Sequence, residues 1–142
     1  MTRIKIVLPD KFLFTCTIPV RITDINYGGH VGNDTVLSII HEARMQFLKH
    51  HDYTELEFAG LGMIMSDVAI EFKTELFYGD EVIVSIAAED FTRISFDLVY
   101  KLEKLSGNKK LLVATAKTGM VCYDYSNKRI IAIPEEARRN LQ

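Results

Sequence analysis

The stretch that decides the fold is DTVLSIIHEARMQFLKHH, residues 34–51. Its apolar positions recur at intervals of three and four, the spacing that gathers side chains on one face of an α-helix. That face comprises Val36, Ile39, Ile40, Ala43 and Phe47. We therefore expect one long amphipathic helix over residues 34–51, which needs an apolar surface to pack against.

Residues at both ends of this stretch suit a helix. Asn33 or Asp34 has the short polar side chain typical of an N-cap. The paired glycines upstream, Gly28 and Gly29, allow the chain to approach the helix start closely. Basic residues complement the negative pole of the helix dipole at the other end, where the sequence has Lys49, His50 and His51.

The rest of the chain is dominated by alternating apolar and polar residues, which predicts β-strands. These runs are residues 12–22, 63–73, 82–88, 94–103 and 112–122. Ser106-Gly107-Asn108 separates the last two runs and predicts a hairpin turn. Pro19 in the first run indicates an edge strand or a bulge. Residues 134–141 favour a short C-terminal helix with Pro134 in its first turn.

One strand, one long helix and four mostly antiparallel strands, in that order, predict an α+β fold in a single domain of residues 1–142. The helix would lie against one curved antiparallel sheet of five to six strands. A single sheet leaves the outer face of the helix uncovered. A second copy of the chain is the simplest cover, so we expect a homodimer or homotetramer.

Composition excludes several classes of function. The 142 residues are 48% apolar and 25% charged, as in an ordinary soluble domain. A net charge of −2 provides no field that would attract nucleic acid. No apolar run approaches the roughly 20 residues of a membrane helix, and no signal peptide is recognisable. Cys16 and Cys122 stand apart, which favours reduced thiols in a cytoplasmic protein, with a disulfide as the alternative.

The residues most suited to chemistry precede the predicted helix, in the stretch RITDINYGGHVGN, residues 21–33. Polar side chains capable of binding or catalysis gather there: Asp24, Asn26, His30 and Asn33. Helix N-termini present free N–H groups and a positive dipole end, which suit a developing negative charge. The alternative is a polar loop whose side chains only cap the helix.

This stretch resembles the signature of the hot-dog-fold acyl-CoA thioesterases, of the 4-hydroxybenzoyl-CoA thioesterase group. The resemblance is carried by the run Arg21-x-x-Asp24-x-Asn26-x-x-Gly29-His30-Val31-x-Asn33, followed in the helix by Glu42-Ala43-Arg44. It implies a long helix wrapped by an antiparallel sheet, pairing of two copies edge to edge, and sites at the dimer interface. It also implies an acyl thioester of coenzyme A or acyl carrier protein as substrate.

Two positions depart from the pattern of that family. Asn26 stands where many members have the catalytic aspartate, and Gly32 stands where the first of two paired asparagines is usual. Asparagine can hold a water molecule or the thioester oxygen, but it cannot accept a proton. A different residue must therefore act as the base if the protein is an enzyme.

Three residues could supply that base. Glu42 matches the helix glutamate of the family, although it could instead be a structural partner of an arginine. Asp24 shares a face with Asn26 in an extended chain, or it forms a turn. His30 has a suitable intrinsic pKa, or it shapes the loop.

The resulting hypothesis is thioester hydrolysis without a cofactor. Backbone N–H groups of Val31 and Gly32, flanked by Gly29 and Asn33, would polarise the carbonyl group. Asn26 would position the water or thioester, and Glu42 from across the dimer would activate the water. Adaptable side chains would line the acyl site, namely Phe58, Met63 and Met65.

Other functions remain as alternatives. A non-catalytic acyl-thioester-binding protein is favoured by Asn26. A hydratase or dehydratase on the same fold would need a His–Asp arrangement, and a purely structural dimer would need no site. A metal site is not expected, because His50 and His51 are adjacent and a helix would aim them about 100° apart.

Overall fold

The fold is described by a computed structural model that covers residues 3–142. Its elements follow in the order β1 (Phe14–Pro19), the 3-10 turn η1 (Ile22–Asp24), α1 (Asn33–His50), β2 (Gly62–Phe72), β3 (Glu81–Glu89), β4 (Ser95–Ser106), β5 (Lys109–Asp124), β6 (Arg129–Ile131) and α2 (Glu135–Leu141). The two predicted helices and five predicted strands are all present, and the 106–108 hairpin turn joins β4 to β5.

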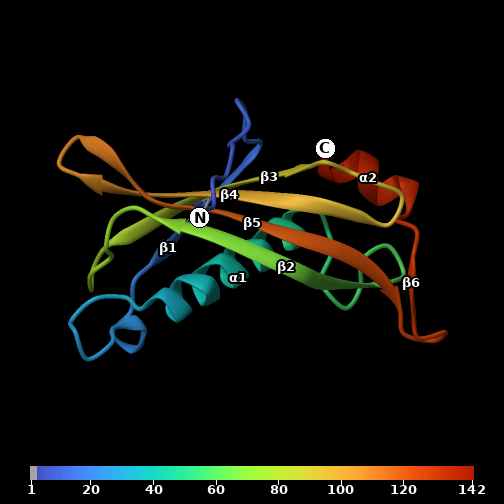
Figure 1. Ribbon diagram of the computed structural model, residues 1–142, viewed down its shortest axis with the longest axis horizontal. Helices are drawn as coiled ribbons and strands as arrows, with labels where there is room; N and C mark the ends of the chain where they lie inside the picture. The colour runs from blue at the N-terminus through green and yellow to red at the C-terminus, as the bar shows by residue number, and fades with distance from the viewer. Residues whose placement is uncertain (1–2) are drawn as a thin grey trace.

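The strands form one antiparallel sheet in the order β1-β3-β4-β5-β2, with β6 paired to β5. Helix α1 lies across one face of this sheet (Figure 1), which confirms the predicted α+β, hot-dog arrangement. Pro19 ends the edge strand β1 and pairs with Glu81, so the predicted edge position is also confirmed. The loop before α1 lies at one end of the sheet and α2 at the other (Figure 1).

The core lies between α1 and the sheet. The apolar face of the helix is buried as the spacing predicts, with Ile40 and Ala43 fully covered and Phe47 2% exposed. It packs in one cluster with sheet side chains such as Phe96 and Leu98. Full burial of each large apolar side chain stabilises the fold by roughly 1.5–3 kcal/mol, so this face contributes strongly to holding the helix on the sheet.

The start of α1 differs from the sequence prediction. The N-cap is Gly32, not Asn33 or Asp34, and it makes no side-chain capping hydrogen bond within the described residues 3–142. Its carbonyl group already accepts the N–H groups of Thr35 at 3.0 Å and Val36 at 3.1 Å. The prediction was wrong because a glycine in extended conformation enters the helix one residue before the first polar side chain.

Two short elements were not predicted. The turn η1 depends on Asp24, which reaches back to the backbone N–H of Arg21 at 2.8 Å. Strand β6 has three residues, and it continues the sheet by pairing Ile131 with Cys122. Segments of three residues are too short to show a periodic pattern, so their sequence carries no signal for either element.

A polar cluster with a buried centre lies under the middle of α1. The guanidinium group of Arg44, 4% exposed, donates to the Tyr100 hydroxyl at 3.3 Å. That hydroxyl shares a 2.7 Å hydrogen bond with the hydroxyl of Thr118. Glu55 lies 3.9 Å from Arg44 and 2.6 Å from the ring of His41. We call these five residues the Arg44 cluster; it joins α1 to the loop that follows it and to β4 and β5.

Candidate active site at the start of α1

The loop before α1 is closed by its own backbone. Ile25 and Val31 form an isolated β-bridge. The N–H of Asn26 donates to the carbonyl of His30 at 2.9 Å, and the N–H of Gly29 donates to the carbonyl of Asn26 at 3.1 Å. Gly29 has φ +85°, a conformation that side chains rarely tolerate. This closure brings Asn26 and His30 next to each other.

The carboxamide group of Asn26 is oriented by the loop. Its oxygen accepts the N–H of Gly28 at 2.9 Å and the N–H of His30 at 3.4 Å. The NH₂ group must therefore point the other way, and its nitrogen lies 3.4 Å from where a Cβ at position 32 would be. Asn26 thus presents two N–H donors in front of the first turn of α1.

His30 is held with one defined nitrogen free. Its Nδ1 lies 3.1 Å from the carbonyl oxygen of Val31, and because a carbonyl only accepts, Nδ1 must carry the proton. In the neutral ring, Nε2 then keeps its lone pair. This atom lies 3.6 Å from where a Cβ at position 28 would be, and the Asn26 oxygen lies 3.3 Å from the same point. His30 and Asn26 therefore flank Gly28, with Glu75 3.9 Å beyond Nε2.

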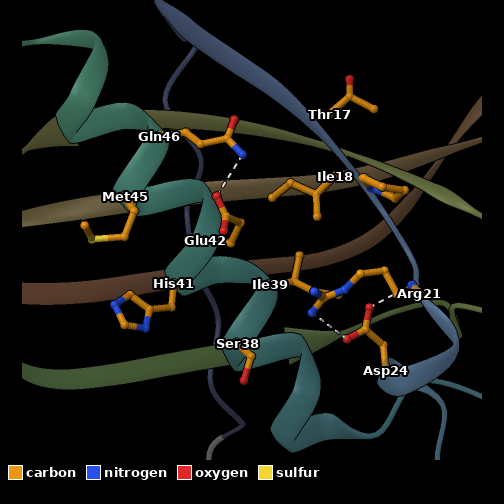
Figure 2. Close-up of a pocket in the computed structure, with 11 residues that line it drawn as sticks. Thr17, Ile18, Arg21, Asp24, Ser38, Ile39, His41, Glu42, Met45 and Gln46 are labelled. Atoms are coloured by element: carbon orange, nitrogen blue, oxygen red, sulfur yellow. Dashed lines mark hydrogen bonds and ion pairs between the residues drawn. The ribbon is translucent and has the colours of Figure 1, made fainter.

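Asp24, by contrast, is occupied by structural contacts. It is 8% exposed and accepts both the backbone N–H and, at 3.4 Å, the guanidinium group of Arg21. Figure 2 shows its carboxylate turned toward Arg21, on the segment that follows β1. These contacts hold η1 together and leave the carboxylate little freedom to act on a substrate.

Glu42 lies on α1 away from the loop cluster. Its carboxylate is exposed and accepts the amide of Gln46 at 2.9 Å, along the helix (Figure 2). Glu42 is eight residues after Asp34, so at 1.5 Å per residue it lies about 12 Å further along the helix axis. Within one chain, Glu42 and the first turn of α1 cannot both contact one water molecule.

An open groove runs between β1 and α1. Its first part, about 440 Å³, is lined by Asp24 and Glu42 among others. An adjoining hollow of about 850 Å³ shares Glu42, Met45 and Gln46 with it. Cys16 borders this hollow, and burial, with the nearby carboxylate of Glu42, raises the pKa of its thiol to about 11. Cys16 is therefore protonated at neutral pH and unsuited to nucleophilic catalysis.

The other residues predicted for the site lie as follows. The N–H of Val31 donates to the carbonyl of Leu76 at 2.9 Å, so it could reach a thioester only if that bond opened. Met63 is 3% exposed and packs in the core. Met65 packs against the core from a partly buried position. Phe58 is fully buried, and none of these last three lines the groove.

Residues 3–142 contain no group of three or more His, Cys, Asp or Glu side chains placed to hold a metal ion. Over the same residues, no helix is both long enough and apolar enough to cross a membrane. Cys16 and Cys122 are both free thiols.

Sequence reasoning missed two contributors to this region. Asp34, considered only as a helix cap, turns its carboxylate toward Gly32. Met45 lines both parts of the groove but lies outside the apolar face that faces the core. The signal for Asp34 was its place directly after Gly32 and Asn33; nothing in the spacing distinguished Met45 from a surface residue.

The sequence profile of the Thioesterase-like superfamily matches residues 20–141. A thioesterase-superfamily protein from Jannaschia sp. CCS1 superposes with a TM-score of 0.82 and 19% identity, covering 94% of this chain and 83% of that one. A 1,4-dihydroxy-2-naphthoyl-CoA thioesterase from Synechocystis gives 0.79 and 19%, covering 90% and 94%.

A third solved structure is an aspartate-to-asparagine mutant of 4-hydroxybenzoyl-CoA thioesterase in complex with 4-hydroxybenzoyl-CoA. It superposes with a TM-score of 0.82 and 16% identity, covering 91% of this chain and 98% of that one. At these low identities the structural likeness establishes the shared fold, and the profile match establishes the family.

Proposed function

The chain belongs to the Thioesterase-like superfamily, and on that premise we propose that it hydrolyses acyl thioesters of coenzyme A or of acyl carrier protein. The observation that carries the proposal is the arrangement at the start of α1. The NH₂ group of Asn26 and the imidazole ring of His30 are held in fixed orientations beside one exposed helix end. The donors of Asn26 thus lie on the Gly32 side of its carboxamide group, and Nε2 of His30 lies on the Gly28 side, both at the exposed start of the helix.

Each group has a role that follows from its chemistry. The N–H donors of Asn26 hold the thioester carbonyl oxygen, where negative charge develops as water attacks. In the neutral ring, Nε2 of His30 is an acceptor that orients a water molecule on the Gly28 side of the loop. The first N–H groups of α1 have no partner within the helix, and the dipole adds to the stabilisation of the oxyanion.

A base is still required, because the side chain of Asn26 cannot take a proton. Glu42, the candidate from the sequence, can serve the same site only from a second copy of the chain. Strand β2 offers a place for that copy: within residues 3–142 it pairs with β5 alone, and no described strand pairs with its other edge, which is eleven residues long. Val68 and Phe72 on this strand are 40% and 46% exposed. We therefore propose a homodimer through β2, which could pair further into a tetramer.

We place the remainder of the substrate in the groove beside α1, whose lining includes Asp24, two residues before Asn26. Its volume of about 440 Å³ lies within the range of small-molecule sites. Ile18, Ile39 and Met45 give it apolar walls, and Arg21 stands at its rim. An acyl chain or pantetheine arm would lie along these walls. The free thiols fit a reducing compartment, and we propose the cytoplasm.

The test is release of thiol from a panel of short-chain, medium-chain and aromatic acyl-CoA compounds. The purified protein should hydrolyse at least one, and His30→Ala should lower kcat by about tenfold or more. Glu136→Gln, which removes an exposed carboxylate from the first turn of α2, is the matched control and should retain full activity. Wild-type protein inactive on the whole panel would contradict hydrolysis.

A second function is favoured by one observation, the asparagine at position 26. A protein that binds acyl thioesters without cleaving them would keep the donors of Asn26 and need no base. Calorimetric titration with the same acyl-CoA panel separates the two: binding with no thiol release identifies the binding protein.

A further inference from the structure

The carboxylate of Asp34 occupies the space that Gly32 leaves open. A Cβ at position 32 would lie 2.6 Å from Oδ1 of Asp34 and 3.4 Å from Nδ2 of Asn26. Both side chains therefore border one small space, which exists because residue 32 has only hydrogen there. Asp34 is the second residue of α1, and its side chain is exposed to solvent. A substrate held by Asn26 would be within its reach.

The two positions that depart from the thioesterase pattern, 26 and 32, lie side by side around this space. Position 26 has lost the acid, and position 32 has lost the side chain that would stand between residues 26 and 34. Together these changes put a carboxylate next to residue 26, on the helix instead of the loop. Asp24 is engaged by Arg21, and Glu42 lies about 12 Å further along the helix. Of these three carboxylates, Asp34 is the one that borders the same space as the NH₂ group of Asn26.

We propose that Asp34 is the catalytic base, and that the carboxylate of this site has moved from position 26 to position 34. This inference rests on the proposed thioesterase function and names the residue that performs its proton transfer. It requires no residue of a second copy for the base, whereas Glu42 does.

In the proposed reaction, one proton moves from water to Asp34 and then from Asp34 to the leaving thiolate. The carboxylate removes a proton from water as the water oxygen bonds to the thioester carbon, and the carbonyl π electrons move to the oxygen held by Asn26. When the tetrahedral intermediate collapses, the C–S bond breaks and the thiolate takes the proton back from Asp34. The products are the carboxylic acid and the free thiol, and Asp34 ends as it began.

The test is a carboxylate exchange between the two positions, measured by steady-state thiol release with the best substrate of the panel. Asp34→Asn should lower kcat by about a hundredfold with KM changed less than threefold, as expected when a transition-state interaction is lost. Adding Asn26→Asp to that variant should restore at least a tenth of the wild-type kcat, because the acid returns to the position usual in the family. Glu136→Gln again controls for loss of a first-turn carboxylate.

The outcomes separate this inference from the function on which it rests. Wild-type kcat in Asp34→Asn, or failure of Asn26→Asp to restore it, would overturn the role of Asp34 while leaving the thioesterase intact. Loss of activity in Glu42→Gln with full activity in Asp34→Asn would return the base to Glu42. An inactive wild-type protein would overturn both. Circular dichroism of each variant confirms that a loss of activity is not a loss of folding.

Discussion

Helix α1 carries two polar clusters, one under its middle and one at its start, and they are built differently. The Arg44 cluster joins residues far apart in the chain, such as Arg44 and Tyr100, and Arg44 is 4% exposed. The cluster of Asn26, His30 and Asp34 spans nine consecutive residues, and Asp34 is exposed. A buried charge is tolerated only where partners compensate it. The polar groups of the first cluster therefore bond to one another and stabilise the fold. The second leaves donors and acceptors for a ligand.

The largest effect is expected from removing the buried charge. Arg44→Ala leaves Glu55 and the Tyr100 hydroxyl without their cation and opens a cavity, so the free energy of unfolding should fall by about 3–5 kcal/mol. Urea denaturation followed by circular dichroism measures this. Arg139→Ala, at an exposed position of α2, is the control and should change stability by less than about 0.5 kcal/mol.

Arg44→Met sharpens the same comparison. It keeps much of the volume and removes the charge, so it should be less damaging than alanine. If both variants were as stable as the wild type, the Arg44 cluster would not be a structural element, and the contrast with the start of α1 would fail.

Removal of the Tyr100 hydroxyl should have the next largest effect. Tyr100→Phe deprives Arg44 of its 3.3 Å contact and Thr118 of its 2.7 Å contact, both in the buried interior. Unsatisfied buried groups cost about 1–3 kcal/mol, and we expect a loss of about 2 kcal/mol in unfolding free energy. The turnover number should remain within about twofold of the wild type, because this hydroxyl does not face the site. A large fall in kcat with unchanged stability would mean that the two clusters are coupled.

Asn26→Asp alone tests the start of the helix. It places a second carboxylate beside Asp34, and two like charges at short range raise the pKa of one of them. The base is then less ionised at neutral pH, so kcat at pH 7 should fall by about tenfold, and the acidic limb of the pH–rate profile should move to higher pH. A higher plateau with an unshifted limb would indicate instead that position 26 alone suits the acid.

The sequence predicts features that depend on neighbouring residues better than features that join distant parts of the chain. The buried face of α1 and the β4–β5 hairpin were predictable, because helical spacing and a Ser106-Gly107-Asn108 turn are local signals. The Arg44 cluster was not, since no pattern tells which residues 56 positions apart will meet. At the start of α1 the sequence indicated Asn26 and His30. It did not show that Asp24 is engaged by Arg21 or that Asp34 turns back over Gly32, because side-chain direction at a helix end depends on the exact N-cap.

The smallest effect, and the one that best separates scaffold from site, is expected at Gly32. Its φ of −72° is open to any residue, so alanine requires no backbone strain. Replacing glycine by alanine restricts the unfolded chain and should raise the unfolding free energy by about 0.4–1 kcal/mol. The new methyl group, however, would lie 2.6 Å from the Asp34 carboxylate and must displace it, while Asn26 at 3.4 Å can stay. Gly32→Ala should therefore be as stable as the wild type or more so, yet about threefold slower. Thermal denaturation and kcat measured on the same preparation provide both values. A variant that gained stability and kept its full turnover number would show that the position of the Asp34 carboxylate has no effect on the reaction.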